Sequence, residues 1–511
     1  MGSANDKRLF LACFMAIVTT AFGFIVRAMI MDTWATEFGL NETEKGEIFG
    51  VGLWPFAITI VLFSLLIDKI GYGRAMVFAF ICHVVSVVVT VTAKGYWGLY
   101  VGNLIVALGN GAVEAVINPV VATMFPKEKT KWLNILHAGW PGGLVVGGLL
   151  AIALGATTGW QIKVGLILIP TILYGILMLG CKFPVNERVA AGVTYKDMLK
   201  EFGALGALVV VALIVSELSR VFGLPNQYPD SHRWIEGAII AVLVLSFWGY
   251  VQSLGRPMFV FLLLIMIPLA TTELGTDSWI TPLMEPEMKA LGLQAGWVLV
   301  YTSAIMMILR FFAGPIVHRI SPLGLLAASA LIAALGLVAL SKSTGMMILA
   351  AATLYGFGKT FFWPTMLGVV AEQFPKGGAL TLNATGGVGM LGVGVVGAAF
   401  LGNIQDKAID TTLEQQAPAI HAIVAGAEQN SVFGKYQPLD PKKVAELDEA
   451  DKAEIVKVQD EAKKSALTTV AIFPVLMFVC YAGLIVYFRA KGGYKQVHVE
   501  ETVEEAATSE F

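Results

Sequence analysis

The chain has 511 residues, of which 56% are hydrophobic and only 14% are charged. A soluble domain carries about 25% charged residues, so this composition excludes an ordinary soluble protein and indicates a polytopic membrane protein. The formal net charge of −2 indicates no nucleic-acid partner.

Fourteen apolar segments predict membrane-spanning helices, because about 20 mostly apolar residues cross the hydrocarbon core. The first span follows Lys7 and Arg8, yet it is too long for a signal peptide and has no small-residue cleavage site, so we expect a retained first helix. In chain order the spans are expected at 9–31, 46–67, 74–93, 97–124, 136–156 and 160–181; at 203–222 and 234–254; and at 257–280, 294–316, 322–341, 345–371, 379–402 and 466–488.

The loops predict the orientation of the chain, because cytoplasmic loops of membrane proteins are enriched in lysine and arginine. The enrichment here predicts that both termini are cytoplasmic, and we expect the protein in the cell (inner) membrane. The polar segment 403–465 is then external, and the stretch 440–466 predicts one helix capped by Asp440. The acidic residues 491–511 predict a disordered cytoplasmic tail.

Two pairs of similar segments indicate an internal repeat. "FPKEKTKWLN" begins at Phe125 and "FPKGGALTLN" at Phe374, and "LIDKIGYG" (66–73) and "IVHRISPLG" (316–324) match in nearly the same register. The repeat predicts two six-helix halves, at 1–182 and 257–490, with a linker and an inserted helical pair in 183–256. Parallel halves of this kind are a transporter architecture, with the substrate near the midplane between them.

Several motifs resemble a known family. "SLLIDKIGYGRA" is similar to the loop between helices two and three of the major facilitator superfamily, with Asp68 and Arg74 at its charged positions. "GNGAVEAVINPVVATMFP", followed by "LNILHAGWPGG", resembles the fucose-permease branch of sugar–proton symporters, which would give roles to Glu114, Asn118 and Asn134. The resemblance implies an all-α major facilitator fold and a proton gradient as the energy source, with no cofactor.

The sequence departs from that branch in helix one, where fucose permeases carry an aspartate. The nearest alignment of "FIVRAMIMD" puts Ala28 at that position, with Arg27 beside it. A fixed cation thus replaces a carboxylate that could take a proton, which leaves the substrate and the coupling scheme open.

Six ionisable side chains lie deep inside expected spans. A charge at the bilayer centre costs at least about 3 kcal/mol, so such residues usually pair or face a water-filled cavity. By the resemblance, helices one, four, seven and ten, counted without the inserted pair, line the central cavity. These are the spans at 9–31, 97–124, 257–280 and 345–371, and Arg310 alone falls outside them. We expect Arg310 to tie helices together, and a purely structural pair of Arg27 with Glu114 stays an alternative. The six are Arg27, Glu114, Glu273, Asp277, Arg310 and Lys359.

Three sets of candidate residues follow from these observations. Packing or ordinary interhelical hydrogen bonds are the alternative for the aromatic and amide side chains, and His83 and His137 are interpreted as structural. The candidates are Glu114, Glu273 and Asp277 for proton coupling; Arg27, Asn118, Asn134, Lys359, Trp363, Asn383 and Trp279 for substrate binding; and Asp68, Arg74 and Arg310 for gating or structure.

The sequence predicts a secondary active transporter, with proton symport of a sugar or sugar-like solute as the first hypothesis. In it Glu114 takes the proton, while Lys359 and Arg27 set its pKa and contact the substrate. The alternatives are a carrier of an anionic solute such as a sugar acid, and a non-transporting receptor. The sequence contains no nucleotide-binding motif, nucleophile elbow or metal-ligand cluster, so we expect neither an enzyme nor a metal site. The expected partners are a small-molecule solute and the lipid bilayer, and the expected state is a monomer.

Overall fold

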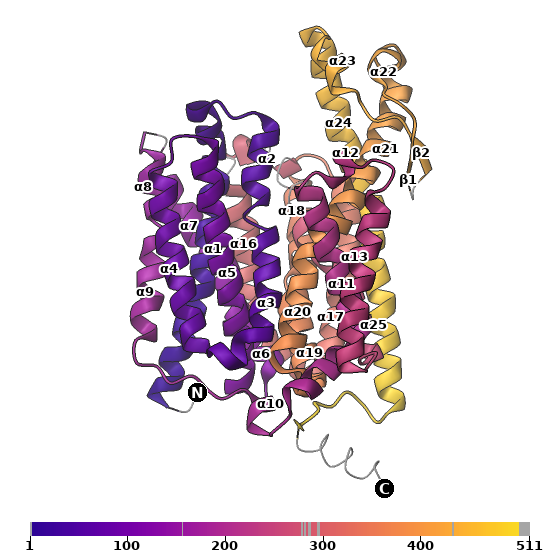
Figure 1. Ribbon diagram of the computed structural model, residues 1–511. Helices are drawn as coiled ribbons and strands as arrows, with labels where there is room; N and C mark the ends of the chain where they lie inside the picture. The colour runs from indigo at the N-terminus through magenta and orange to yellow at the C-terminus, as the bar shows by residue number, and fades with distance from the viewer. Residues whose placement is uncertain are drawn as a thin grey trace.

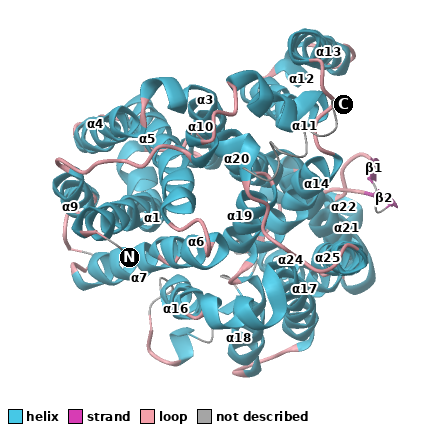
Figure 2. Cartoon of the chain, turned by 90° about the horizontal axis from the view of Figure 1, so that it is seen from below, coloured by secondary structure: helices cyan, strands magenta, loops and turns pink. Residues whose placement is uncertain are grey.

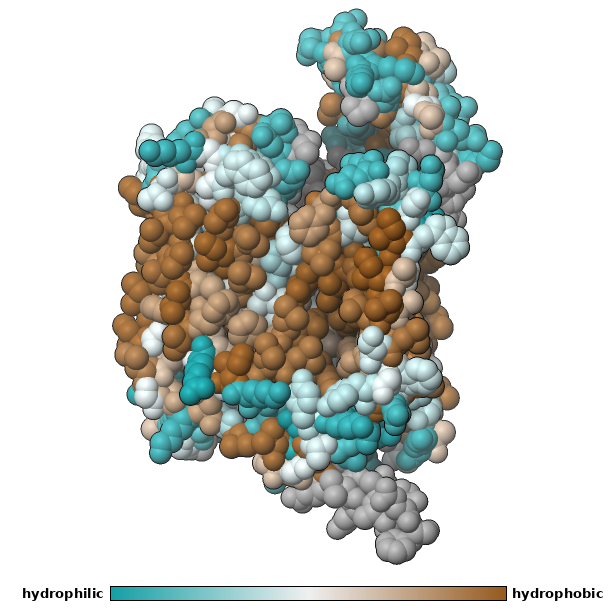
Figure 3. All heavy atoms as spheres, viewed as in Figure 1, coloured by the Kyte–Doolittle hydropathy of each residue, from teal (hydrophilic) through white to brown (hydrophobic). Residues whose placement is uncertain are grey.

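The computed structural model describes residues 3–155, 157–276, 280, 283–284, 288–293, 297–431 and 434–499. Long helices form two halves that stand side by side (Figure 1). Helix α1 (Ala4–Phe38) begins and helix α25 (Ile472–Ala490) ends at the same end of the bundle, which we call the basal end. The opposite end is the distal end. The face drawn in Figure 3 has an apolar belt between two hydrophilic ends, as expected for a bundle that crosses a membrane.

The first half contains the helices expected from the first six apolar segments, three of which are divided by short breaks. Besides α1 they are α2 (Glu42–Gly50), α3 (Trp54–Ile70), α4 (Tyr72–Val91), α5 (Tyr96–Met124), α6 (Lys129–His137), α7 (Gly139–Ala153), α8 (Trp160–Gly165) and α9 (Leu168–Met178).

The second half repeats this pattern with more irregular backbone, including the two π-helical turns η1 and η3. Besides α25 its elements are α14 (Pro257–Ala270), η1 (Thr271–Gly275), α16 (Trp297–Phe311), α17 (Ala313–Lys342), α18 (Met347–Lys359), α19 (Phe362–Gln373), η2 (Pro375–Gly377), α20 (Gly378–Gly392), η3 (Val393–Gly397), α21 (Ala398–Gln416), α22 (Pro418–Val424), β1 (Gln429–Ser431), β2 (Gly434–Tyr436), α23 (Pro441–Ala445) and α24 (Glu449–Val470).

Within the described part of the chain, twelve helices are long and apolar enough to cross a membrane. The chain is therefore a multi-pass membrane protein, and the expected count of fourteen is approximate. The remaining two expected spans, 294–316 and 345–371, correspond to the 15-residue α16 and to α18 with α19.

The linker and the inserted pair join the halves through α10 (Glu187–Ala190), α11 (Tyr195–Val221), α12 (Leu224–Gln227) and α13 (His232–Val251). Helix α11 packs against α14 and α20 of the second half, and α13 lies outside it (Figure 2). Gly203 interrupts α11 with φ +63°, and a Cβ there would lie 2.0 Å from the backbone nitrogen of Gly255. This close approach fixes the base of the inserted hairpin.

Small residues bring the halves together. Helix α3 packs on α20, and α7 packs on α16. A Cβ on Gly387 would lie 2.7 Å from Val61, and one on Gly148 would lie 3.0 Å from Val300. Such small residues let helix backbones approach closely where lipid supplies no hydrophobic driving force.

Helices α21 and α24 extend beyond the distal end and form an appendage with α22, α23 and the β1–β2 hairpin (Figure 1). The expectation of one helix over 440–466 was wrong, because the side chain of Asp440 caps the short α23 and that of Asp448 caps a second helix, α24. The appendage has its own small apolar core, formed by Leu413, Val424, Ile455 and Val458.

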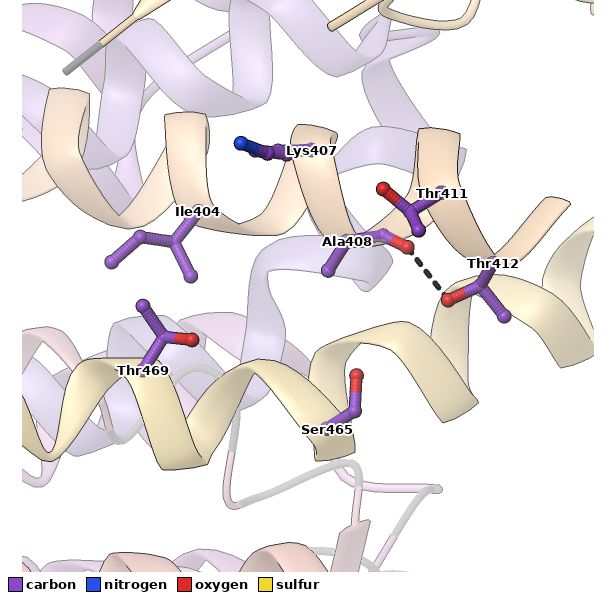
Figure 4. Close-up of a pocket in the computed structure, with 7 residues that line it drawn as sticks. All are labelled: Ile404, Lys407, Ala408, Thr411, Thr412, Ser465 and Thr469. Carbon is purple, nitrogen blue, oxygen red and sulfur yellow. Dashed lines mark hydrogen bonds between the residues drawn. The ribbon is translucent and has the colours of Figure 1, made fainter. Parts of the chain in front are cut away.

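A cavity of about 370 Å³ lies between α21 and α24 (Figure 4). Its walls carry several hydroxyl groups, one of which, Thr412 Oγ1, donates to the carbonyl of Ala408 at 2.7 Å. None of the buried charges expected at the functional site lines this cavity. Its lining residues are Ile404, Lys407, Ala408, Thr411, Thr412, Ser465 and Thr469.

Candidate functional site

The expected span 345–371 is broken in the middle of the bundle. Helix α18 ends at Lys359 and α19 begins at Phe362. Pro364 accounts for the break, because it has no N–H to bond the carbonyl of Thr360 four residues earlier. The backbone N–H of Trp363 instead donates to Oε2 of Glu273 at 2.9 Å. The broken helix therefore offers one carbonyl and one amide to side chains of neighbouring helices.

Arg310 of α16 satisfies two carbonyls that prolines have freed. It is 2% exposed, and its Nε donates to Thr360 O and its Nη1 to His137 O, each at 2.8 Å. The second carbonyl lacks its helical donor because Pro141 lies four residues further on. Nη2 donates to Oε1 of Glu273 at 2.7 Å and completes a buried ion pair. Arg310 thus connects both halves, in the arrangement expected of a residue that ties helices together.

Glu273 lies on the π-helical turn η1, which continues α14. π-Helical segments occur mostly as single turns within α-helices, and often at functional sites. The carboxylate is 3% exposed, and its two oxygens accept from Arg310 and from the amide of Trp363. Glu273 is therefore held by a fixed cation and a fixed amide, on opposite oxygens.

Lys359, at the end of α18, is 2% exposed and points toward the same turn. Its Nζ donates to the backbone carbonyl of Glu273 at 3.3 Å and lies 5.6 Å from the ring centroid of Tyr355. The Tyr355 hydroxyl is in turn 2.6 Å from Oγ1 of Thr276. The expected lysine in the centre of the bundle is thus part of the contact between α18 and η1.

Glu114 of α5 lies in different surroundings. It is 6% exposed, and its Oε2 accepts from Nδ2 of Asn118 at 2.7 Å. Oδ1 of Asn118 lies 2.9 Å from Nε2 of His137. Glu114 makes no ion pair with any residue that the structure describes. His137, interpreted as structural from the sequence, connects this carboxylate to the Arg310 cluster, because its carbonyl accepts from Arg310.

Two of the expected asparagines bridge the halves. Nδ2 of Asn383 donates to the carbonyl of Ala115 at 2.9 Å, a carbonyl that Pro119 has freed in the same way. Nδ2 of Asn134 donates to Oγ1 of Thr365 at 3.1 Å. The side-chain oxygens of both asparagines are buried and have no hydrogen-bond partner among the described residues.

Arg27 is buried but lies apart from Glu114. Its Nη2 donates to Oγ of Ser86 on α4 at 2.8 Å, and its Nη1 donates to the carbonyl of Gly23 at 3.2 Å. Its Nε has no hydrogen-bond partner in the described part of the chain. The structure therefore does not bring Arg27 and Glu114 together as an ion pair, and the guanidinium lies within the first half.

The indole of Trp363 packs against α20, since a Cβ on Gly389 would lie 2.7 Å from it. Asp277 and Trp279 lie outside the described residues. At the basal end Asp68 pairs with Arg188 of the linker, and Arg74 is exposed on α4.

A hydrogen-bonded cluster joins the halves at the basal end. Oε1 of Glu372 accepts from the backbone N–H of Thr130 at 3.1 Å and from its hydroxyl at 2.6 Å. Oε2 accepts from the hydroxyl of Tyr494 at 2.8 Å, and the N–H of Val497 donates to the Glu372 carbonyl at 2.9 Å. Burial raises the pKa of the Tyr494 phenol well above its usual value, so it stays a donor. Residues 494–497, expected in a disordered tail, instead lie against the bundle, and 500–511 are outside the described residues.

Neither the basal cluster nor the role of the prolines was predicted from the sequence. Pro119, Pro141 and Pro364 each lie four residues after a carbonyl that accepts a hydrogen bond from a distant side chain. Prolines inside apolar spans were the available signal, because each one must leave a carbonyl without its helical donor.

Two packed helical halves with broken helices and buried charges at mid-depth define a polytopic membrane protein of the transporter type. A family model of the Major Facilitator Superfamily matches residues 9–394, so the chain belongs to this family. The family expected from the sequence motifs is thereby confirmed.

Known relatives match only parts of the chain. The cis,cis-muconate transport protein of Acinetobacter baylyi is 26% identical over 179 residues, which are 35% of this chain and 43% of that protein. The gentisate transporter of Corynebacterium glutamicum is 23% identical over 161 residues, 31% of this chain and 36% of that protein. The chain thus spans less than half the length of either relative in these matches.

The fold is also similar to solved structures. The crystal structure of the E. coli fucose:proton symporter FucP has a TM-score of 0.54 at 16% identity, and the match covers 92% of this chain and 99% of that one. At this identity the likeness concerns the fold alone.

Proposed function

We propose that the protein is a secondary active transporter that works by alternating access and couples a sugar or sugar-like solute to protons, with Glu114 as the proton carrier. The observation that carries this proposal is the environment of Glu114. Its buried carboxylate is bonded to the neutral amide of Asn118, and no described cation pairs with it. Burial without a cation favours the neutral form of a carboxyl group, so it can gain and lose a proton as its hydration changes.

The contacts of the neighbouring cations support the same assignment. Lys359 donates to the carbonyl of Glu273, and Arg27 donates to Ser86, so neither ion-pairs with Glu114. The hypothesis that Lys359 and Arg27 set the pKa of Glu114 is therefore not part of the proposal. His137 instead positions the carboxylate's partner, because it engages Oδ1 of Asn118 and leaves Nδ2 directed at Glu114.

The solute is inferred from polar groups between the halves. Asn134 and Asn383 each have a buried side-chain oxygen that lacks a donor among the described residues, and hydroxyl groups of a sugar are suitable donors. Both amide nitrogens bridge the halves, so a solute bound to the oxygens would respond to their separation. Alternating access would then require Thr130 and Glu372 to part at the basal end.

A carrier of an anionic solute is the second candidate. Lys359 lies deep in the bundle, and the two relatives described above are named for the transport of muconate and gentisate, which are carboxylates. In this case Lys359 would bind the carboxylate of the solute, and Glu114 would be free to carry the proton.

Reconstituted protein tests the proposal. Thermal stabilisation first selects among neutral sugars, sugar acids and other carboxylates, and uptake into liposomes is then measured with and without a pH gradient. We expect uphill uptake only with the gradient. Glu114→Gln should abolish uphill uptake and keep solute exchange, whereas the control Glu449→Gln, an exposed glutamate of the appendage, should leave both unchanged.

Three outcomes would change the proposal. Undiminished uphill uptake by Glu114→Gln would move the proton site to Glu273 or Asp277. Selective uptake of carboxylates would favour the anion carrier. Binding without flux of any solute would favour a receptor with a transporter fold.

We also propose that the basal end is cytoplasmic. A cysteine placed at the exposed Tyr228, between α12 and α13, should then react with impermeant reagents from outside intact cells, and one at Lys182 should not. Labelling of both positions from the same side would contradict this orientation.

A further inference from the structure

A cavity of about 870 Å³ lies at the basal end and is lined by residues at or near the ends of α6, α17, α19 and α25. Figure 2 shows the arrangement of these helices seen from that end. The buried charges at mid-depth do not line it, whereas Glu372, Thr130 and Tyr494 of the basal cluster do. Its walls come from both halves: Lys127 and Lys131 belong to the first, and Arg319 and Arg489 belong to the second.

The cations of this cavity are largely unpaired. Lys127, Arg319 and Arg489 are exposed, and none of them makes a hydrogen bond or ion pair with a described residue. Lys131 is fixed in place, since its Nζ lies 3.0 Å from Oε1 of Glu128 and its side chain packs on Gly314. Three cations at the rim are therefore available to a ligand.

The two carboxylates of the lining are already engaged. Glu128 accepts from Lys131 and lies 3.2 Å from Nε2 of His318, and the bond from Lys131 lowers the pKa of its carboxyl group. Glu372 accepts from Thr130 and Tyr494. The lining contains four lysine or arginine side chains and two carboxylates, so its formal charge is +2.

One wall of the cavity is apolar and belongs to α25, a helix whose outer surface is also apolar. Ile485 and Phe488 line the cavity. Along the same helix Leu476, Val479 and Val486 are 52%, 59% and 67% exposed, in the part of the chain expected to face lipid. A ligand held by the cations could therefore extend an apolar chain along α25, which a free inorganic anion could not do.

We propose that this cavity binds the phosphate headgroup of an anionic phospholipid, with its acyl chains along α25. Basic pockets between transmembrane helices bind such headgroups by charge and hydrogen bonds. Because the four cations come from both halves, the bound headgroup bridges the halves at the basal end. It thereby favours the arrangement in which Thr130 and Glu372 are in contact.

Native mass spectrometry of the purified chain tests the proposal. The protein is mixed with phosphatidylglycerol, with phosphatidylcholine, and with inorganic phosphate as a separate probe, and bound lipid and thermal stability are measured. The wild type should bind phosphatidylglycerol in preference to phosphatidylcholine and be stabilised by it. The variant Lys127→Gln/Arg319→Gln/Arg489→Gln should bind phosphatidylglycerol at least about tenfold more weakly, since each surface cation contributes to attraction of anionic lipid.

A matched control is Lys182→Gln, which removes an exposed lysine at the basal end outside the cavity and should bind as the wild type does. All four substitutions are on exposed side chains, so the variants should fold. Equal phosphatidylglycerol binding by the triple variant and the wild type would overturn the proposal. Stabilisation by inorganic phosphate equal to that by phosphatidylglycerol would also overturn it, because the acyl chains would then contribute nothing.

Discussion

Glu273 and Glu114 are both buried glutamates in the middle of the bundle, and their surroundings are opposite. Glu273 is 3% exposed and has a guanidinium on one oxygen and a backbone amide on the other. Glu114 is 6% exposed and has a neutral side-chain amide. Similar burial thus accompanies two different sets of partners. Depth in an apolar segment identifies a carboxylate as unusual, but its partner decides whether it is fixed or free to titrate.

The difference has a physical origin in the backbone. Pro364 and Pro141 free two carbonyls that only a multidentate donor such as Arg310 can satisfy together, and that donor then brings its charge to Glu273. In the first half Pro119 frees the carbonyl of Ala115, and the neutral Asn383 takes it. The carbonyls freed by Pro141 and Pro364 are therefore satisfied by a cation, and the carbonyl freed by Pro119 is satisfied by a neutral amide.

The largest effect is expected at the fixed pair. Arg310→Gln removes the guanidinium that pairs with the buried Glu273 carboxylate, so the variant should lose about 3 kcal/mol or more of stability. Thermal unfolding of the purified protein measures the loss. The double variant Glu273→Gln/Arg310→Gln buries no charge and should recover part of it. A single variant as stable as the wild type would show that the pair does not hold the bundle together.

Lys359→Met should affect transport and leave folding intact. Methionine is similar in length and apolar, so it can occupy the space beside Tyr355 without a buried charge, while the contact with the Glu273 carbonyl is lost. We expect nearly complete loss of uptake into liposomes at normal expression and thermal stability. Near-normal uptake would make Lys359 a packing residue, and its substrate-binding assignment would fail.

Glu114→Gln should have a small effect on stability, in contrast to the variants of the fixed pair. Glutamine has nearly the same shape and can still accept from Asn118, so unfolding should shift by less than about 1 kcal/mol. Thermal unfolding of Glu114→Gln and of Glu273→Gln, measured under the same conditions, compares the two losses of stability. If Glu114→Gln is the more destabilised of the two, the carboxylate has a charged partner and the distinction between the two glutamates is lost.

The smallest effect is expected at the basal cluster. Tyr494→Phe removes one hydrogen bond to Glu372, worth about 1 kcal/mol. Hydrogen exchange at the amide of Val497, which is bonded to the Glu372 carbonyl, should become about fivefold faster in proportion to that loss. Tyr228→Phe, at an exposed tyrosine, is the control and should leave this amide unchanged.

The sequence alone determined the class of protein and its repeat. Apolar segments of about 20 residues are long enough to cross the hydrocarbon core, so the composition identified a membrane bundle. The Phe-Pro-Lys repeat indicated that the bundle has two halves. The sequence also singled out Glu114, Glu273, Arg310 and Lys359, because a charge inside an apolar segment is costly wherever it lies. The sequence did not predict where a proline divides a span: the expected span 345–371 consists of two helices, α18 and α19.

Only the tertiary structure decided which buried charges meet. Arg310 and Glu273 are 37 residues apart, Thr130 and Glu372 are 242 apart, and neither pair has a local sequence signal. Arg27, for which a structural pair with Glu114 was an alternative, donates to Ser86 on α4. The physical reason is that helix packing sets the direction of each side chain, whereas sequence spacing describes neighbours on one helix alone. Whether a buried carboxylate is paired depends on groups that only folding brings within hydrogen-bonding distance.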